Sequence, residues 1–227
     1  MNPFPLRYAG WMAFDLARGP ALPMLLLCLL AVFLQVSVNG TPLWSGYWVS
    51  LAFVLLGSAG IVSNDFFRGY HRVLFTKPLS PPLYYLLRWL LGAAVVALAV
   101  LIVDAGVALR LGLPMQGLRL VMQAELLYVL LGGLVFLLST VTRRDWVLAV
   151  VLMIGQSVIG EIRSVGFWSG RLWTALYTVL PPFHLTRFRQ PVTWGPELAH
   201  AALYGLGLVL VALIVLHRRP LGSRARD

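Results

Sequence analysis

Charge is the scarcest property of this 227-residue sequence. Charged residues make up 11% of the chain and hydrophobic residues 59%, whereas an ordinary soluble domain carries about 25% charge. So little polar surface cannot cover a soluble fold, which excludes soluble globular, disordered and nucleic-acid-binding proteins. Cys28 is the single cysteine, so an internal disulfide is excluded as well. The composition therefore predicts an integral membrane protein.

Long apolar runs predict an all-α fold with six transmembrane helices. A helical span needs about 20 mostly apolar residues, and six segments reach or approach that length. They are approximately 21–38, 46–63, 83–109, 118–141, 146–161 and 198–216. With no internal repeat or low-complexity segment between them, residues 1–227 are expected to form a single membrane domain.

Two further segments are expected to lie at the membrane surface. Residues 1–19 mix apolar and charged side chains, which predicts a helix lying in the interface. The apolar core of 162–197 is too short to span the membrane and ends at Pro181 and Pro182. This region is therefore expected to be an external re-entrant element before the last span.

Basic residues predict the orientation, because cytoplasmic loops carry an excess of lysine and arginine. With six spans both termini share a side, and that side collects 12 of the 18 basic residues. These are Arg7, Arg18, Arg68, Arg72, Lys77, Arg88, Arg143, Arg144, Arg218, Arg219, Arg224 and Arg226. Both termini are therefore predicted to be cytoplasmic, and the net charge of +10 suits loops beside an anionic lipid leaflet.

Segment 64–78 has the pattern of a short amphipathic helix. At 100° per residue its polar face collects Asp65, Arg68, Gly69, Arg72 and Thr76. Asn64 is the expected N-cap, and Pro78 ends the helix just after Lys77. Such a helix most commonly only anchors a loop in the interface. Its polar face is mixed, and it connects directly to the third span. Both features favour a helix whose displacement is transmitted to the transmembrane helices.

The stretch 60–80 resembles a motif of type-2 ABC transporter permeases, which carry a cytoplasmic helix and a Pro-Leu-Ser turn after the second span. The residues that fit the motif are Asp65, Arg68, Gly69, Leu74, Thr76, Pro78, Leu79 and Ser80. The six-span layout, the re-entrant element and the short basic tail are also similar to that family. Phe66-Phe67-Arg68 departs from it, since the family more often has a polar pair there.

The resemblance implies the membrane subunit of an ATP-driven exporter, with 64–78 as the coupling helix that contacts a separate ATPase subunit. The implied coupling residues are Asp65, Arg68, Gly69, Arg72, Thr76, Lys77 and Pro78. Lys77 is the only lysine and no phosphate-binding loop surrounds it. ATP and Mg²⁺ are therefore expected on the partner ATPase, and this chain is expected to be neither an enzyme nor a cofactor carrier.

Six helices are too few to enclose a wide path, so we expect a second permease subunit, in a homodimer or a heterodimer. The expected location is the inner (plasma) membrane of a bacterium. The candidate path residues are Phe33, Trp48, Phe53, Tyr128, Phe136, Asp104 and Glu125. These aromatics favour hydrophobic cargo, although they are also ordinary lipid-facing residues, and a glycan cargo stays open.

Ionisable groups inside spans need an explanation, because each costs about 2.5–3.5 kcal/mol at a helix centre. Asp104, Glu125 and Glu161 lie toward the outer ends of three spans. They either surround an exit for substrate or pair with external arginines, and we prefer the pairing. The arginines within reach are Arg110, Arg119 and Arg163.

Uncharged small and amide residues within the spans predict helix packing. The small residues are Gly57 to Gly60, Gly132, Gly133, Gly205 and Gly207, and the amides are Gln35, Gln123 and Gln156. We expect the glycines to permit close helix contact and the amides to bond between helices.

Two other functions compete with transport. Gly155-Gln156-Ser157 and His200 are faintly similar to an intramembrane serine protease of six spans, although Gly-x-Ser triplets are common in packed helices. The other alternative is a non-catalytic membrane scaffold. The four histidines are scattered, which makes a catalytic metal site improbable.

Overall fold

The computed structural model describes residues 21–33, 37–38, 41–42, 46–67, 80–164, 181–183 and 196–218. This part of the chain is helical apart from one small strand pair, in which β1 (Ser37–Val38) lies antiparallel to β2 (Thr41–Pro42). The predictions for segment 1–19, for 68–79 and for most of 162–197 lie outside these residues.

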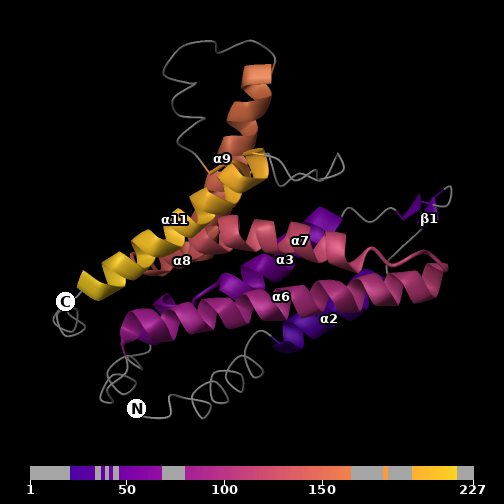
Figure 1. The fold of residues 1–227 in the computed structure, drawn as a ribbon, viewed down its shortest axis with the longest axis horizontal. Coiled ribbons are helices and arrows are strands. Elements are labelled where there is room, and N and C mark those ends of the chain that lie inside the picture. The colour runs from indigo at the N-terminus through magenta and orange to yellow at the C-terminus, as the bar shows by residue number, and fades with distance from the viewer. Residues whose placement is uncertain are drawn as a thin grey trace.

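The helices follow one another in an elongated bundle (Figure 1). They are α2 (Ala21–Phe33), α3 (Gly46–Ser58), α4 (Ser63–Phe67), α6 (Pro81–Leu111), α7 (Gly117–Leu127), the π-helix η1 (Tyr128–Gly132), α8 (Gly133–Ser139), α9 (Asp145–Ser164) and α11 (Pro196–Arg218). The predicted all-α class is confirmed for this part of the chain.

Three helices are long and apolar enough to cross a membrane. They are Pro81–Leu111, the continuous Gly117–Ser139 and Leu198–Arg218. Val49–Asp65, which runs from α3 through the following turn into α4, and Asp145–Ile159 are shorter apolar stretches. The chain is thus compatible with membrane association. Six spans were predicted, and three of them correspond to helices of sufficient length.

The first predicted span extends too far, and a turn interrupts the second. The helix that begins at Ala21 ends at Phe33, and 37–38 belong to the strand pair rather than to a span. α3 ends at Ser58, and the chain then turns through 59–62, where Gly60 has a φ of 69°. A positive φ of this kind favours glycine, which explains why the helix stops there.

The helix after that turn also begins earlier than predicted. α4 starts at Ser63, so Asn64 is its second residue and not its N-cap. The hydroxyl of Ser63 is bonded to a residue from another helix, described below. The start of α4 is therefore determined by a tertiary contact that local sequence does not reveal.

The ends of α6 follow local sequence rules. Pro81 and Pro82 occupy its first turn, where a missing N–H costs nothing, and Gly112 closes it with a φ of 65° and an N–H bond to the Ala108 carbonyl. Its 31 residues extend about 46 Å at 1.5 Å per residue. Since a hydrocarbon core is about 30 Å thick, α6 is longer than a membrane span needs to be.

Glycines permit the closest helix contacts in the bundle. A Cβ atom on Gly92 of α6 would lie 2.7 Å from the Gly57 carbonyl oxygen of α3. One on Gly133 of α8 would lie 2.8 Å from the Gly205 carbonyl oxygen of α11. The predicted packing role is confirmed at Gly57, Gly133 and Gly205, whereas Gly207 has no atom within 4 Å of its would-be Cβ.

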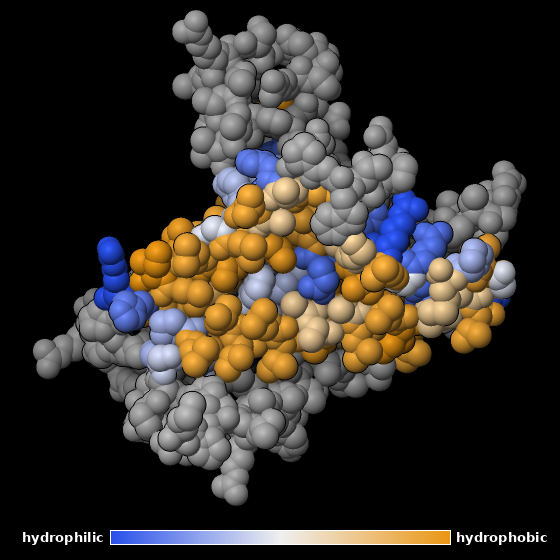
Figure 2. All heavy atoms as spheres, viewed as in Figure 1, coloured by the Kyte–Doolittle hydropathy of each residue, from blue (hydrophilic) through white to orange (hydrophobic). Residues whose placement is uncertain are grey.

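The face shown in Figure 2 is mostly hydrophobic along the bundle, with smaller polar patches between the apolar areas. Exposed large apolar side chains occur on α6, α9 and α11, and include Leu98, Leu109, Val151, Leu203 and Leu210. α9 packs against α8 and otherwise projects from the bundle (Figure 1). Apolar surface this extensive suits contact with lipid or another subunit rather than water.

Candidate functional site

Polar side chains gather where the chain leaves α3 and enters α4. We call the residues Gly60, Ser63, Asp65, Arg88 and Asp145 the α4 junction. They come from three separate segments: the turn and α4, the second turn of α6, and the first residue of α9. Hydrogen bonds join all three segments in a largely apolar protein.

The first link of the α4 junction is an ion pair between α4 and α6. Arg88 Nη1 lies 2.8 Å from Asp65 Oδ2 and also donates to the Ile61 carbonyl at 3.2 Å. The Asp65 side chain is 8% exposed and that of Arg88 18%. Because removing one partner would leave a charge with little access to water, the pair holds α4 firmly against α6.

The second link joins the same turn to α9. Asp145 Oδ2 accepts hydrogen bonds from the Gly60 N–H at 3.0 Å and from the Ser63 hydroxyl at 3.2 Å. Asp145 Oδ1 accepts from the N–H of Trp146 at 2.8 Å, at the start of α9, where a helix favours negative charge. Asp145 lies just before the predicted fifth span, and burial raises the pKa of its carboxyl while the three hydrogen bonds oppose that rise.

Together these links tie residues 60–65 to two long helices at once. Arg88 and Asp145 both lie near the beginnings of their helices, so the α4 junction acts close to one end of each. A displacement of α4 cannot leave both helices in place without breaking a buried polar contact. The arrangement is therefore suited to passing a movement of this segment on to α6 and α9.

Only one predicted coupling residue falls among the described residues. Asp65 is 6% exposed and accepts a hydrogen bond from Arg88, so it fastens the segment to α6. The predicted contacts Arg68, Gly69, Arg72, Thr76, Lys77 and Pro78 lie outside the described residues.

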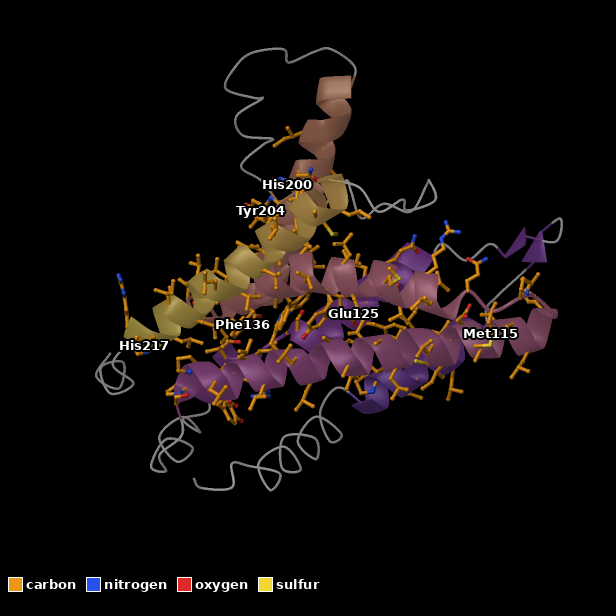
Figure 3. All side chains as sticks on the ribbon, viewed as in Figure 1. Met115, Glu125, Phe136, His200, Tyr204 and His217 are labelled. Carbon is orange, nitrogen blue, oxygen red and sulfur yellow. The ribbon has the colours of Figure 1, made fainter. Side chains whose placement is uncertain are left out.

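The candidate path aromatics are packing residues in the single chain. Phe53, Tyr128 and Phe136 are fully buried, and the Tyr128 hydroxyl donates to the Trp89 carbonyl at 2.7 Å. Figure 3 shows Phe136 between α8, α11 and α6. The side chains of Phe33 and Trp48 are not among those described. The described aromatics thus line no open path within one copy.

No arginine pairs with Asp104 or Glu125 among the described residues. Asp104 is 6% exposed and accepts a hydrogen bond from the Gln116 N–H at 2.9 Å, so it holds the turn between α6 and α7. Glu125 is half-buried, and its Oε1 has no hydrogen-bond partner within the described part of the chain. The side chain of Glu161 is not among those described.

The protease arrangement finds no support in the geometry. In the described residues no hydrogen bond joins Ser157 to His200. The exposed His200 ring instead lies 6.4 Å from the ring of Tyr204, edge to face (Figure 3). Nor do three or more histidine, cysteine, aspartate or glutamate residues of the described part gather where they could hold a metal ion.

Sequence reasoning missed Arg88 and Asp145 as site residues. Arg88 was counted only for orientation, although an arginine five residues inside a predicted span is a signal that it needs a buried partner. Asp145 immediately precedes an apolar run, where an acid is typical of a helix start. Their bonds to residues 23 and 85 positions away have no local signature.

No protein-family model, no curated protein and no solved structure matches the chain.

Proposed function

We propose that the chain is the membrane-spanning permease subunit of an ATP-driven exporter of the type-2 ABC class. A separate ATPase subunit binds ATP and Mg²⁺ and contacts segment 64–78. A second permease subunit, identical or similar, completes the substrate path. The complex resides in the inner membrane of a bacterium.

The α4 junction is the observation that carries the proposal. A loop that only anchors in the interface needs no buried polar bonds to the bundle, since its apolar face supplies the binding. Here the segment that enters 64–78 is fastened to α6 by Asp65 and Arg88, and to α9 by Asp145. Fastening of this kind is what a force-transmitting segment requires, because a loose segment would move alone.

The proposed topology uses α2, α3, α6, the continuous α7 to α8, α9 and α11 as six spans. Arg88, Arg144 and Arg218 belong to the side proposed as cytoplasmic, and Arg110 and Arg119 to the other side. Arg88 and Arg110 lie near opposite ends of α6, in agreement with this assignment. Both chain termini are then cytoplasmic.

The mechanism follows from the two links. ATP binding draws two ATPase subunits together, and each presses on the 64–78 segment of a permease subunit. The ion pair between Asp65 and Arg88 passes that displacement to α6, and the bonds to Asp145 pass it to α9. Tilting of these helices opens a path between the two permease copies.

The coupling contact can be tested by photocrosslinking in native membranes. A photoreactive amino acid at Arg72 should form a crosslink to an ATPase subunit, and the same residue at Arg110 should not. Arg110 is the matched control because it carries the same charge but lies at the other end of the bundle. A crosslink to an ATPase at Arg110 alone, or at neither position, would contradict the proposal.

Charge reversal tests whether that contact transmits work. Arg68→Glu or Arg72→Glu should uncouple ATP hydrolysis from export, because each weakens the contact with the ATPase. The chain should still insert normally, because neither change affects the folding of the helix bundle. The measurements are ATPase activity and export in reconstituted complexes. Unchanged coupled activity in both variants would count against the assignment.

A further inference from the structure

A cavity of about 470 Å³ lies at the beginning of α7, away from the α4 junction. Its polar lining comes from Gln116, Arg119 and Gln123, and its apolar wall includes Leu118, Met122 and Leu126. Ligand pockets commonly enclose about 300–1,000 Å³ and combine apolar walls with a few polar groups. The cavity has both features.

Gln123 is the least expected of these residues, because its side chain is buried but makes no bond. It is 5% exposed, and within the described part of the chain its amide has no hydrogen-bond partner. The bond between helices expected from sequence is not made, so the amide is left to bond a molecule in the cavity.

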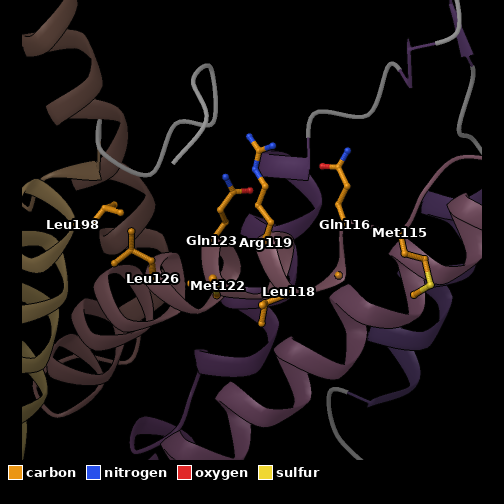
Figure 4. Close-up of a pocket in the computed structure, with 9 residues that line it drawn as sticks. Met115, Gln116, Leu118, Arg119, Met122, Gln123, Leu126 and Leu198 are labelled. Atoms are coloured by element: carbon orange, nitrogen blue, oxygen red, sulfur yellow. The ribbon is translucent and has the colours of Figure 1, made fainter. Parts of the chain in front are cut away.

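Arg119 lies beside that amide and is equally unengaged. No ion pair or hydrogen bond to its guanidinium occurs among the described residues. Positions 116, 119 and 123 fall within about 60° on a helix of 3.6 residues per turn. Figure 4 shows the heads of Gln116, Arg119 and Gln123 directed the same way, with Met122 and Leu118 on another side. The three polar heads therefore face one region.

The charge of the lining favours an anion. Arg119 is the one charged residue in the described lining, and no acid accompanies it. The nearby Asp104 carboxylate is buried and already accepts the Gln116 N–H. A planar guanidinium binds phosphate with two parallel hydrogen bonds, and amides can donate to the remaining oxygens. A positively charged amine would find no acid in this lining to pair with.

The position along the bundle favours a lipid over a soluble anion. The cavity follows the end of α6, about 35 Å along that helix from Arg88 at 1.5 Å per residue. That separation approximates the thickness of a hydrocarbon core, about 30 Å, so the cavity lies at headgroup depth. The apolar wall continues down α7 through Met122 and Leu126, in the direction that an acyl chain takes.

We propose that this cavity binds an anionic phospholipid. Arg119 holds the phosphate, Gln116 and Gln123 bond oxygens of the headgroup, and an acyl chain lies along Leu118, Met122 and Leu126. The site lies at the opposite end of the bundle from the α4 junction. The proposal therefore stands or falls independently of the exporter function.

Native mass spectrometry of the purified full-length protein tests the proposal, with phosphatidylglycerol and phosphatidylcholine as the two probes. The wild type should retain phosphatidylglycerol over phosphatidylcholine. Arg119→Gln should bind phosphatidylglycerol about tenfold more weakly, as expected for the loss of a charged hydrogen bond. Arg110→Gln is the matched control, because it removes the same charge at the same end of α6 without touching the cavity lining, and it should bind like the wild type.

Three results would overturn the proposal. Equal retention of the two lipids would remove the preference for an anion. Equal losses in Arg119→Gln and Arg110→Gln would show general surface charge and no site. Competition by soluble glycerol phosphate at the concentration of the lipid would assign the cavity to a soluble anion.

Size-exclusion chromatography shows whether each variant is folded. Gln123→Met provides a second test, because it fills the same volume without an amide, and it should also weaken the retention of phosphatidylglycerol.

Discussion

Asp65 and Asp145 are both buried carboxylates, yet they are stabilised in different ways. Asp65 has a full opposite charge at 2.8 Å, whereas Asp145 has a helix start, two backbone N–H groups and a hydroxyl. An ion pair needs both partners, because either charge alone is costly in a low-dielectric interior. A carboxylate held by neutral donors tolerates the loss of one donor more easily. The ion pair is thus the more sensitive link of the α4 junction.

Removing one partner of the ion pair should destabilise the protein strongly. Arg88→Met is expected to lower the free energy of unfolding by about 3 kcal/mol, because the buried Asp65 loses the opposite charge that lies 2.8 Å away. The double variant Asp65→Leu with Arg88→Met should recover much of that loss, since both charges of the pair are removed together. Unfolding in mixed micelles measures both values.

A double variant as unstable as the sum of its two single variants would contradict this account of the pair. The double variant should also lose coupling while it keeps its stability, because apolar contact replaces the directed bonds. In the double variant at Asp65 and Arg88, stability is therefore expected to be regained while coupling between ATP hydrolysis and export is lost.

At the scale of elements, α11 packs closely against the π-helix η1 at Gly205. A Cβ atom on Gly205 would lie 2.7 Å from the Val129 carbonyl carbon, on the first turn of η1. A π-helix widens the backbone and is frequent at functional sites. The contact leaves no room for a side chain on α11, so glycine is required there.

Gly205→Ala should push α11 away from η1 and cost about 1–3 kcal/mol of stability, as overpacking usually does. Gly207→Ala is the matched control on the same helix, since its Cβ has no atom within 4 Å. It should be neutral or slightly stabilising, because alanine favours a helix by about 1 kcal/mol over glycine. Thermal unfolding in detergent compares the two variants.

If both variants unfold at the same temperature, the close contact between α11 and η1 is not present in the protein. If Gly207→Ala alone is destabilised, another subunit packs against that side of α11.

Hydropathy alone predicted the long helices well, because burial in lipid depends on composition and length. The predicted spans 83–109, 118–141 and 198–216 each match a described apolar helix within two residues at either end. The π-helix at 128–132 was not predicted, since its register depends on packing against α11. Gly132 and Gly133 indicated close contact there but not its form.

The positions where helices are interrupted were less predictable from the sequence, and so were the polar contacts between residues far apart in the chain. The turn at 59–62 interrupts what hydropathy reads as one run, and it depends on a positive φ at Gly60 together with a bond to Asp145. Asp65 was predicted to be important, but its partner Arg88 was not identified. Pairing over long sequence separations requires the tertiary fold, which a pattern along the chain does not contain.

At the scale of the whole molecule, the proposed contact with an ATPase requires one particular orientation in the membrane. The account places Arg144 on the cytoplasmic side and Arg110 outside. Cys28, the only native cysteine, is 3% exposed, so it should not react with a maleimide. Single cysteines introduced at these two arginines can therefore report the side of the membrane.

A membrane-impermeant maleimide added to intact cells, with access to the outer face of the inner membrane, should label Arg110→Cys and leave Arg144→Cys unlabelled. A permeant maleimide should label both, which controls for accessibility of the thiols. The reverse pattern would place the α4 junction outside and would contradict both the orientation and the ATPase contact.

The most direct test of the central claim is a pull-down of the tagged chain from its native membrane in mild detergent, with the bound proteins identified and quantified. The account predicts an ATPase with a phosphate-binding loop at one copy per copy of this chain, and a reduced amount with Arg68→Glu. Recovery of the chain without such an ATPase would contradict the exporter assignment.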